Sequence, residues 1–182
     1  MKKQMDAWVI NHLRKLLSTG KFDYIADAKI DSSLEKVFLY PTDDFFLTQM
    51  QFDAISSLVG EHENLYVMEM GWKTSLGLFD TSNVYYQLSG SSSYEKYSQL
   101  DLSTITLLFS DSFRWAVLCD ELRDFGYGVL FGDAGSIRDF SIAYGSTQKD
   151  ILRYLEFCKL EQDVRNMSFS NLLHVFDAFK AI

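Results

Sequence analysis

Clustered acidic side chains are the groups in this sequence with the clearest capacity for chemistry. Two clusters occur, one formed by Asp120, Glu121 and Asp124 and the other by Asp43 and Asp44. Paired carboxylates act as general acid and base when burial raises the pKa of one partner. Carboxylate oxygens that converge on one point also bind Mg²⁺ or Ca²⁺.

The residues on either side of the first acidic cluster indicate its role. The stretch DELRDFG at 120–126 joins two apolar runs, FRWAVLC at 113–119 and YGVLFG at 127–132. Unpaired acids stay in water, and these acids lack the alternating ligand spacing of a calcium loop. We therefore predict a β-hairpin with a solvated acidic connector and with no catalytic or metal-binding residue. The buried side of the hairpin is expected to comprise Trp115, Val117, Val129 and Phe131.

Other residue types with catalytic potential lack the spacing that their chemistry requires. The three histidines, at 12, 62 and 174, do not form a local zinc motif. Cys119 and Cys158 lie in apolar patterns without a CxxC partner, which predicts buried, inert thiols. The glycines of GYGVLFGDAG bracket a strand rather than opening a helix, so we interpret them as turn or bulge glycines and not as a phosphate loop. No cofactor is predicted.

Aromatic residues gather around a Ser/Gly-rich segment at 79–97, where Tyr85, Tyr86 and Tyr94 lie among small polar residues. Tyrosine beside serine and glycine is typical of contact loops in protein recognition. The same pattern fits a strand in which Tyr85 and Tyr86 alternate between its two faces. The sequence favours neither interpretation.

The charge distribution favours a protein partner over nucleic acid. The 182 residues carry a net charge of −8, and residues 41–63 include five Asp or Glu with no Lys or Arg. By contrast, residues 1–21 carry five Lys or Arg against one Asp. An acidic surface repels phosphate, whereas it attracts basic proteins and speeds their encounter. Solubility alone also accounts for an acidic composition.

Apolar periodicity predicts the helices and strands. Helices are expected over 3–18, 47–60, 147–160 and 168–180, with Trp8 and Met50 on apolar faces and Thr48 as an N-cap. Strands are expected over 35–41, 64–70, 82–90 and 103–109, followed by the hairpin strands 113–119 and 126–132. The last strands are too close for crossover helices, so they must pair antiparallel.

These elements predict an α+β fold. A mostly antiparallel sheet, with a meander around 64–132, is packed with N-terminal and C-terminal helices in a single domain over residues 1–182. With no apolar run of about 20 residues, a membrane span is not expected. Two cysteines and no secretory signal predict a cytoplasmic protein.

The stretch FSDSFRWAVLCDELRDFGYGVLFG at 109–132 resembles a recurrent bacterial module: a Ser/Asp turn, a Trp-containing strand, an acidic turn and a strand that ends in Gly. It is similar to segments of immunity proteins from contact-dependent growth inhibition and polymorphic toxin systems, and of related small bacterial proteins. The resemblance implies a compact acidic protein without catalytic activity. Such a protein binds a toxin domain, often a basic nuclease, and blocks its active site.

Composition and resemblance together predict a protein that acts by binding another protein, with no direct nucleic-acid or membrane partner. The expected contact residues are Asp43, Asp44, Tyr85, Tyr86, Tyr94, Asp120, Glu121 and Asp124. In this hypothesis carboxylates orient a basic toxin domain, and aromatic rings supply the desolvated area. The alternative is a small enzyme or ligand-binding domain that uses its acids, with or without a divalent metal.

Overall fold

A computed structural model describes the greater part of the chain. The described residues are 2–4, 7–17, 30–43, 46–69, 84–89, 93–102, 105–122, 125–145, 149–150, 152–153 and 156, with the backbone alone for 2–4, 84, 121, 122 and 125. The predicted helix over 168–180 lies outside this part of the chain, whereas residues 149–150, 152–153 and 156 of the predicted helix over 147–160 are helical.

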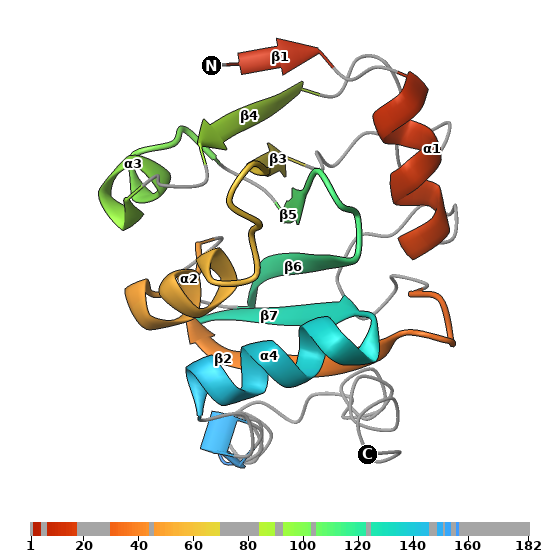
Figure 1. Cartoon of the computed structure of the whole chain (residues 1–182). Coiled ribbons are helices and arrows are strands. Elements are labelled where there is room, and N and C mark those ends of the chain that lie inside the picture. The colour runs from red at the N-terminus through yellow and green to blue at the C-terminus, as the bar shows by residue number, and fades with distance from the viewer. Residues whose placement is uncertain are drawn as a thin grey trace.

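The described elements are strands and helices interspersed along the chain (Figure 1). In chain order they are β1 (Lys2–Gln4), α1 (Ala7–Leu16), β2 (Glu35–Thr42), α2 (Gln49–Ser56), β3 (Asn64–Glu69), β4 (Val84–Ser89), α3 (Tyr94–Ser98), β5 (Thr106–Ser110), β6 (Trp115–Leu122), β7 (Phe125–Gly132) and α4 (Ala134–Tyr144). The predicted α+β class is confirmed, with helices from both the N-terminal part and the C-terminal third of the chain packed on the sheet.

One antiparallel sheet of seven strands organises the molecule, in the order β1-β4-β3-β5-β6-β7-β2. The strands β5, β6 and β7 form the predicted meander. Strand β5 pairs with β3 instead of its chain neighbour β4. As a result β3 lies between β4 and β5, and both β1 and β2 are edge strands.

Helices cover both faces of this sheet (Figure 1). One core cluster combines Val9, Ile10 and Leu13 of α1 with sheet residues such as Ala116 and Phe131. A second cluster on the opposite face combines residues of α2, α3 and α4 with sheet residues including Val117 and Leu130. Strands buried on both faces read as continuous apolar runs, which explains the sequence of β5 and β6.

The hairpin of β6 and β7 therefore has no single buried side, in contrast to the prediction. Its register pairs Val117 with Leu130 and Ala116 with Phe131. Because directly paired residues point to the same face, Trp115 and Val117 lie on the α2–α4 face, whereas Val129 and Phe131 lie on the α1 face. All four are buried.

Local capping explains where two helices begin. The Thr48 hydroxyl accepts a hydrogen bond from the Gln51 backbone N–H at the start of α2, and the Gln51 side-chain oxygen accepts one from the Thr48 N–H, so the predicted N-cap is confirmed as a capping box. Helix α4, which the sequence analysis did not identify, begins at the N-cap Asp133 and ends at Gly145 with φ +67°.

The glycines of the 126–135 stretch are not turn residues, but Gly128 and Gly126 pair with Leu39 and Thr42 on the two sides of a register shift, which fits the predicted alternative of bulge glycines. Gly126, Gly128 and Gly132 lie within β7, and Gly135 lies in the first turn of α4. A Cβ at Gly132 would lie 2.7 Å from both the Arg114 carbonyl oxygen and the Trp115 Cβ. Glycine is required there because β6 approaches the backbone of β7 too closely for a side chain.

Candidate functional site

Asp120 lies in the protein interior, not in a solvated connector. Strand β6 continues to Leu122 and β7 begins at Phe125, so residues 120 and 121 are paired strand residues. Asp120 is only 3% exposed, and the hydroxyl of its cross-strand partner Tyr127 donates to Oδ2 at 3.3 Å. A carboxylate buried in this way cannot contact a protein partner. The Glu121 side chain and Asp124 lie outside the described part of the chain.

Tyr85 is also buried, so it is not a surface contact. The side chains of Tyr85 and Tyr86 point to opposite faces of β4, which was one of the two interpretations of the sequence. Tyr85 is 6% exposed and contacts Tyr66 edge-on, whereas Tyr86 is half-buried on the other face. The Tyr86 hydroxyl donates to the Asp101 carbonyl oxygen at 3.4 Å. The residue therefore fixes the segment that follows α3.

Two of the predicted contact residues, Asp43 and Tyr94, are brought together. Asp43 is exposed in a tight turn whose backbone exchanges two hydrogen bonds with Phe46. Half-buried Tyr94 packs on Phe52 of α2 at a ring distance of 5.9 Å. Burial raises the pKa of Tyr94, and the negative charge of Asp43 raises it further. Asp44 lies outside the described residues.

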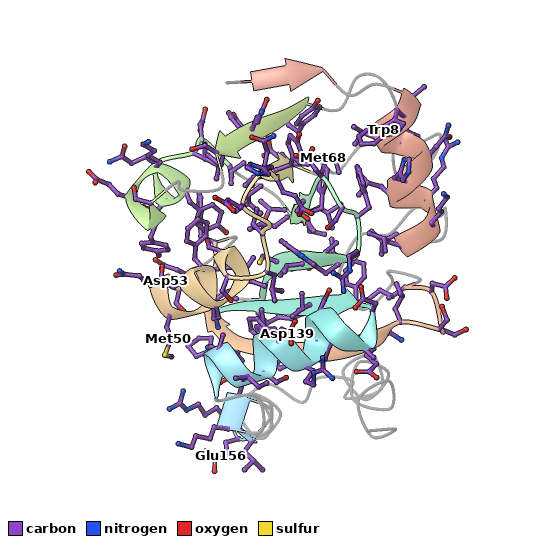
Figure 2. All side chains as sticks on the ribbon, in the orientation of Figure 1. Trp8, Met50, Asp53, Met68, Asp139 and Glu156 are labelled. Carbon is purple, nitrogen blue, oxygen red and sulfur yellow. The ribbon has the colours of Figure 1, made fainter. Side chains whose placement is uncertain are left out.

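The outer side of α2 carries a second exposed feature. Met50, predicted to face the core, is instead 57% exposed, and Asp53 is exposed beside it. Both side chains project outward from α2 (Figure 2). Together with Ala143 of α4 they line an open groove of about 480 Å³. We name Asp43, Met50, Asp53 and Tyr94 the acidic–aromatic face.

The sequence analysis placed neither Met50 nor Asp53 in a site. Its apolar stripe included Met50 because Met50, Ala54 and Ile55 share helical spacing. The capping box fixes α2 so that Gln51, Phe52, Ala54 and Ile55 are buried. An apolar helix face centred on Phe52 would not have included Met50. The position of Phe52 was therefore the feature of the sequence that could have predicted an exposed Met50.

A buried carboxylate lies near the inner side of α2. Asp150 is fully buried, and its Oδ2 accepts from the Tyr40 N–H at 3.1 Å and the Tyr144 hydroxyl at 2.7 Å. Gln51 Nε2 donates to the Pro41 carbonyl oxygen and to the Tyr144 hydroxyl. Burial raises the pKa of Asp150, an effect that these hydrogen bonds oppose. Among the described residues, Oδ1 has no hydrogen-bond partner.

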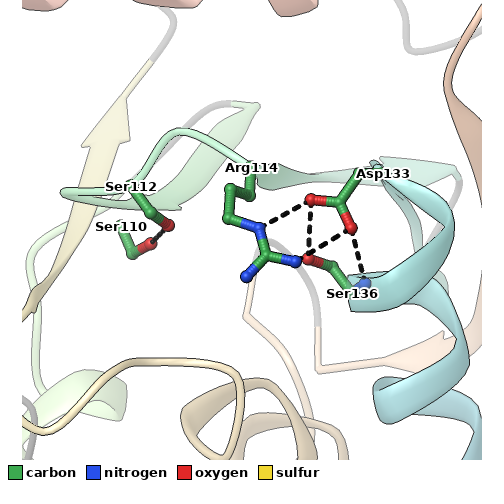
Figure 3. A network of polar contacts seen from close by, with 5 residues as sticks. All are labelled: Ser110, Ser112, Arg114, Asp133 and Ser136. Carbon is green, nitrogen blue, oxygen red and sulfur yellow. Dashed lines mark hydrogen bonds and ion pairs between the residues drawn. The ribbon is translucent and has the colours of Figure 1, made fainter.

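An exposed polar cluster joins β6 to α4 (Figure 3). Arg114 Nε and Nη2 donate to the two carboxylate oxygens of Asp133 at 2.8 and 3.2 Å. Asp133 also accepts from the Ser136 backbone N–H at 2.8 Å as the N-cap of α4. The Arg114 hydrogen bonds are the largest cause that lowers the pKa of Asp133. This arrangement holds the carboxylate as a structural clamp rather than an acid catalyst.

The described cysteine and histidine side chains discussed next are held by burial or by hydrogen bonds. Cys119 is buried, as predicted, and burial raises the pKa of its thiol far above neutral, so the nucleophilic thiolate does not form. Cys158 and His174 lie outside the described residues. His12 is half-buried, and its Nδ1 donates to the Trp8 carbonyl oxygen at 2.9 Å. Within the described ranges, no three His, Cys, Asp or Glu residues gather as metal ligands.

None of the helices in the described ranges is both long and apolar enough to cross a membrane. Among the described residues, the surface feature with the clearest binding geometry is the acidic–aromatic face on α2, α3 and the turn at Asp43. Comparison of the chain with protein-family models, with curated proteins and with solved structures finds no match.

Proposed function

We propose that this protein is a non-catalytic, cytoplasmic binding protein that neutralises a basic toxin domain by covering its active site, as an immunity protein does. The observation that carries the proposal is the acidic–aromatic face. There an exposed apolar side chain, Met50, lines an open groove together with Asp53, while Tyr94 packs on Phe52 of the same helix and is close enough to Asp43 for that charge to raise its pKa. Interfaces combine such an apolar anchor with a polar rim that orients the partner.

Charge gives this face its specificity for a basic partner. Residues 41–63 contain no Lys or Arg, so helix α2 and the turn before it present only negative charge. A surface of one sign steers an oppositely charged protein and raises its association rate, more at low salt than at high salt. A basic nuclease domain, whose own surface must bind phosphate, has the complementary charge.

Two of the predicted contact residues are buried and are therefore left out of the proposed interface. Asp120 and Tyr85 are interior residues, so the face is built from α2, α3 and the turn at Asp43. Partner binding there needs no rearrangement of the sheet. The alternative of a divalent-metal enzyme has no group of described residues to support it, and a metal titration tests it separately below.

The test begins with a neighbouring gene that encodes a secreted protein with a basic toxin domain. Co-expression of the present chain should protect cells that the toxin domain alone kills, and the purified proteins should form a complex in which toxin activity is lost. The proposal is wrong if the two proteins do not associate, or if they associate and the toxin stays active.

A charge-reversal pair locates the interface. Asp43→Lys/Asp53→Lys should slow association with the toxin domain by about tenfold or more at low salt, with a smaller effect at high salt because ions screen exposed charges. Glu35→Lys/Glu156→Lys changes the net charge equally at two exposed positions away from the face. Stopped-flow association rates for both variants separate a local effect from a net-charge effect. Equal slowing would place the interface elsewhere.

A further inference from the structure

A second exposed surface lies on α1, distant from the acidic–aromatic face. Figure 2 places Trp8 on α1, across the molecule from Met50 and Asp53 on α2. Trp8 is 52% exposed, although the helix buries Val9, Ile10, Leu13 and Leu16. The helix is therefore already anchored in the core by its apolar side, and the tryptophan is not needed for that anchoring.

Trp8 is held in place by two other rings. Its ring lies 4.7 Å from His12 and 5.1 Å, edge-on, from Phe113. His12 lies 4.8 Å from Phe113, which stacks in turn on Phe109 at 5.5 Å. An exposed ring that is already held in one orientation loses little conformational freedom when a partner covers it. The cluster is thus preorganised for contact.

The backbone at Phe113 is strained to supply this support. Phe113 has φ +50°, a left-handed conformation that bulky residues rarely adopt. Such a conformation carries an energetic cost for a bulky residue, and strain of this kind gathers at functional sites. The turn between β5 and β6 accepts that cost, and in this conformation the Phe113 ring lies against Trp8 and His12.

Two basic side chains, Arg14 and Lys15, are exposed on the helix that carries Trp8 and His12, and one acid, Asp31, is exposed where its backbone N–H donates to the Leu16 carbonyl oxygen at the end of that helix. Lys15 is exposed on the same stripe of α1 as Trp8 and His12, because residues separated by four and by seven positions share a helix face. Arg14 is exposed next to it. We name Trp8, His12, Arg14, Lys15 and Phe113 the aromatic–basic patch. Its charge is opposite to that of the acidic–aromatic face.

We propose that the aromatic–basic patch binds an acidic segment of another protein chain, with an apolar side chain of that segment seated on Trp8. Tryptophan and arginine are the residues most enriched at binding hot spots. A nucleic acid fits less well, because the patch offers only Arg14 and Lys15 and a single exposed ring, whereas nucleic-acid sites spread several basic side chains and stacking rings along the strand. A membrane surface fits less well, because the apolar side of α1 is buried against the sheet.

The test uses a fluorescein-labelled peptide of glutamates interrupted by leucines and the full-length protein. Fluorescence anisotropy should show binding that weakens with salt, as expected for exposed charges. Trp8→Ala and Lys15→Glu should each weaken binding by about tenfold or more, the loss expected for a hot-spot residue. Lys15 is exposed and makes no part of the core, so this variant reports on binding even if Trp8→Ala is less stable.

Two matched variants serve as controls. Ile142→Ala removes an exposed apolar side chain from α4, outside both named surfaces, and Lys149→Glu reverses the charge of another exposed helical lysine. Neither should change peptide binding. The inference is overturned if wild type shows no binding at peptide concentrations up to about 1 mM, or if Trp8→Ala and Lys15→Glu bind as wild type does.

Other occupants of the patch would be revealed by parallel measurements. If oligothymidine binds more tightly than the peptide, and Trp8→Ala and Lys15→Glu weaken that binding, the partner is a nucleic acid. The same result with phosphatidylserine vesicles would identify a membrane surface as the partner. Self-association in sedimentation that Trp8→Ala abolishes would assign the patch to a second copy of this chain. The outcome is independent of the toxin-domain experiment, since that experiment concerns α2 and α3.

Discussion

The carboxylate of Asp150 shows how one residue links separate parts of the fold. Its Oδ2 accepts hydrogen bonds from the backbone of β2 and from the side chain of Tyr144 in α4, while Oδ1 is buried without a partner among the described residues. An ionised carboxylate in such a site loses its hydration, and only part of that loss is recovered by two hydrogen bonds. The protonated form is therefore favoured more in the folded protein than in the unfolded chain.

This imbalance predicts a pH-dependent stability difference between wild type and Asp150→Asn. Burial raises the folded-state pKa of Asp150 above its unfolded value. The contribution of protonated Asp150 to the free energy of unfolding is therefore complete at pH values below the unfolded pKa. It is lost as the pH rises through the folded pKa. The asparagine variant cannot ionise, and its carbonyl oxygen can accept the same two hydrogen bonds. Wild type should therefore lose stability relative to Asp150→Asn as the pH rises from about 4 to about 8.

Urea denaturation of both proteins at several pH values measures this difference. Asp150→Ala provides the control, because it removes the hydrogen bonds as well as the charge and should be destabilised at every pH, by about 1–3 kcal/mol. A free-energy difference between wild type and Asp150→Asn that does not change with pH would show that Asp150 titrates as an ordinary carboxyl group.

The burial of Asp120 illustrates what the sequence could not reveal about single residues. DELRDF reads as a polar connector because three of its six residues are acids. The strands instead extend through it, and the cross-strand position of Tyr127 provides a hydroxyl donor for the Asp120 carboxylate. That pairing depends on a hairpin register, which is fixed by contacts across the whole sheet and not by the connector itself.

At the level of secondary-structure elements, Gly132 determines how closely β6 and β7 approach. Gly132→Ala should destabilise the protein by about 1–3 kcal/mol, because its Cβ would lie 2.7 Å from the Arg114 carbonyl oxygen and the two strands would have to separate. Thermal or urea unfolding measures the loss. Gly60→Ala is the matched control, since its Cβ would meet only the flexible side chain of Glu63. Equal stability of the two variants would contradict the close-approach argument.

The elements differ in how far the sequence predicts them. Helix α2 carries its own signals, the capping residue Thr48 and a reciprocal Gln51, and was predicted with its N-cap. Helix α4 was missed although it has a capping Asp133, a terminal Gly145 and apolar residues at 137, 140 and 144. The glycines that precede it suggested a loop. The predicted helix over 3–18 is shorter, because residues 2–4 form an edge strand instead.

Trp8 shows the same limit for the face of a helix. The sequence placed Trp8 and Leu13 on one apolar stripe, whereas the structure buries Leu13 completely and leaves Trp8 52% exposed. Apolar spacing identifies α1 as amphipathic. Which flank of the stripe meets the sheet is set by packing against residues far away in sequence, such as Phe109 and Phe131.

For the molecule as a whole, the proposed binding function predicts that divalent cations have no effect on stability. A ligand that binds the native state raises the melting temperature by mass action. We expect Mg²⁺ and Ca²⁺ to leave the melting temperature unchanged in a thermal-shift assay, with EDTA-treated protein as the reference. A concentration-dependent rise would favour the alternative of a metal-dependent enzyme or ligand-binding domain.

The sheet has a further consequence at its β2 edge. The Tyr40 amide hydrogen is taken by Asp150. Because the amides of consecutive strand residues point to opposite sides, a strand from another chain that approached on the side of Asp150 would find the Tyr40 donor already occupied. Natural sheets limit fibrous aggregation by such interruptions. Asp150 therefore also guards the protein against growth of its sheet by strand addition, a protection that Asp150→Ala would weaken.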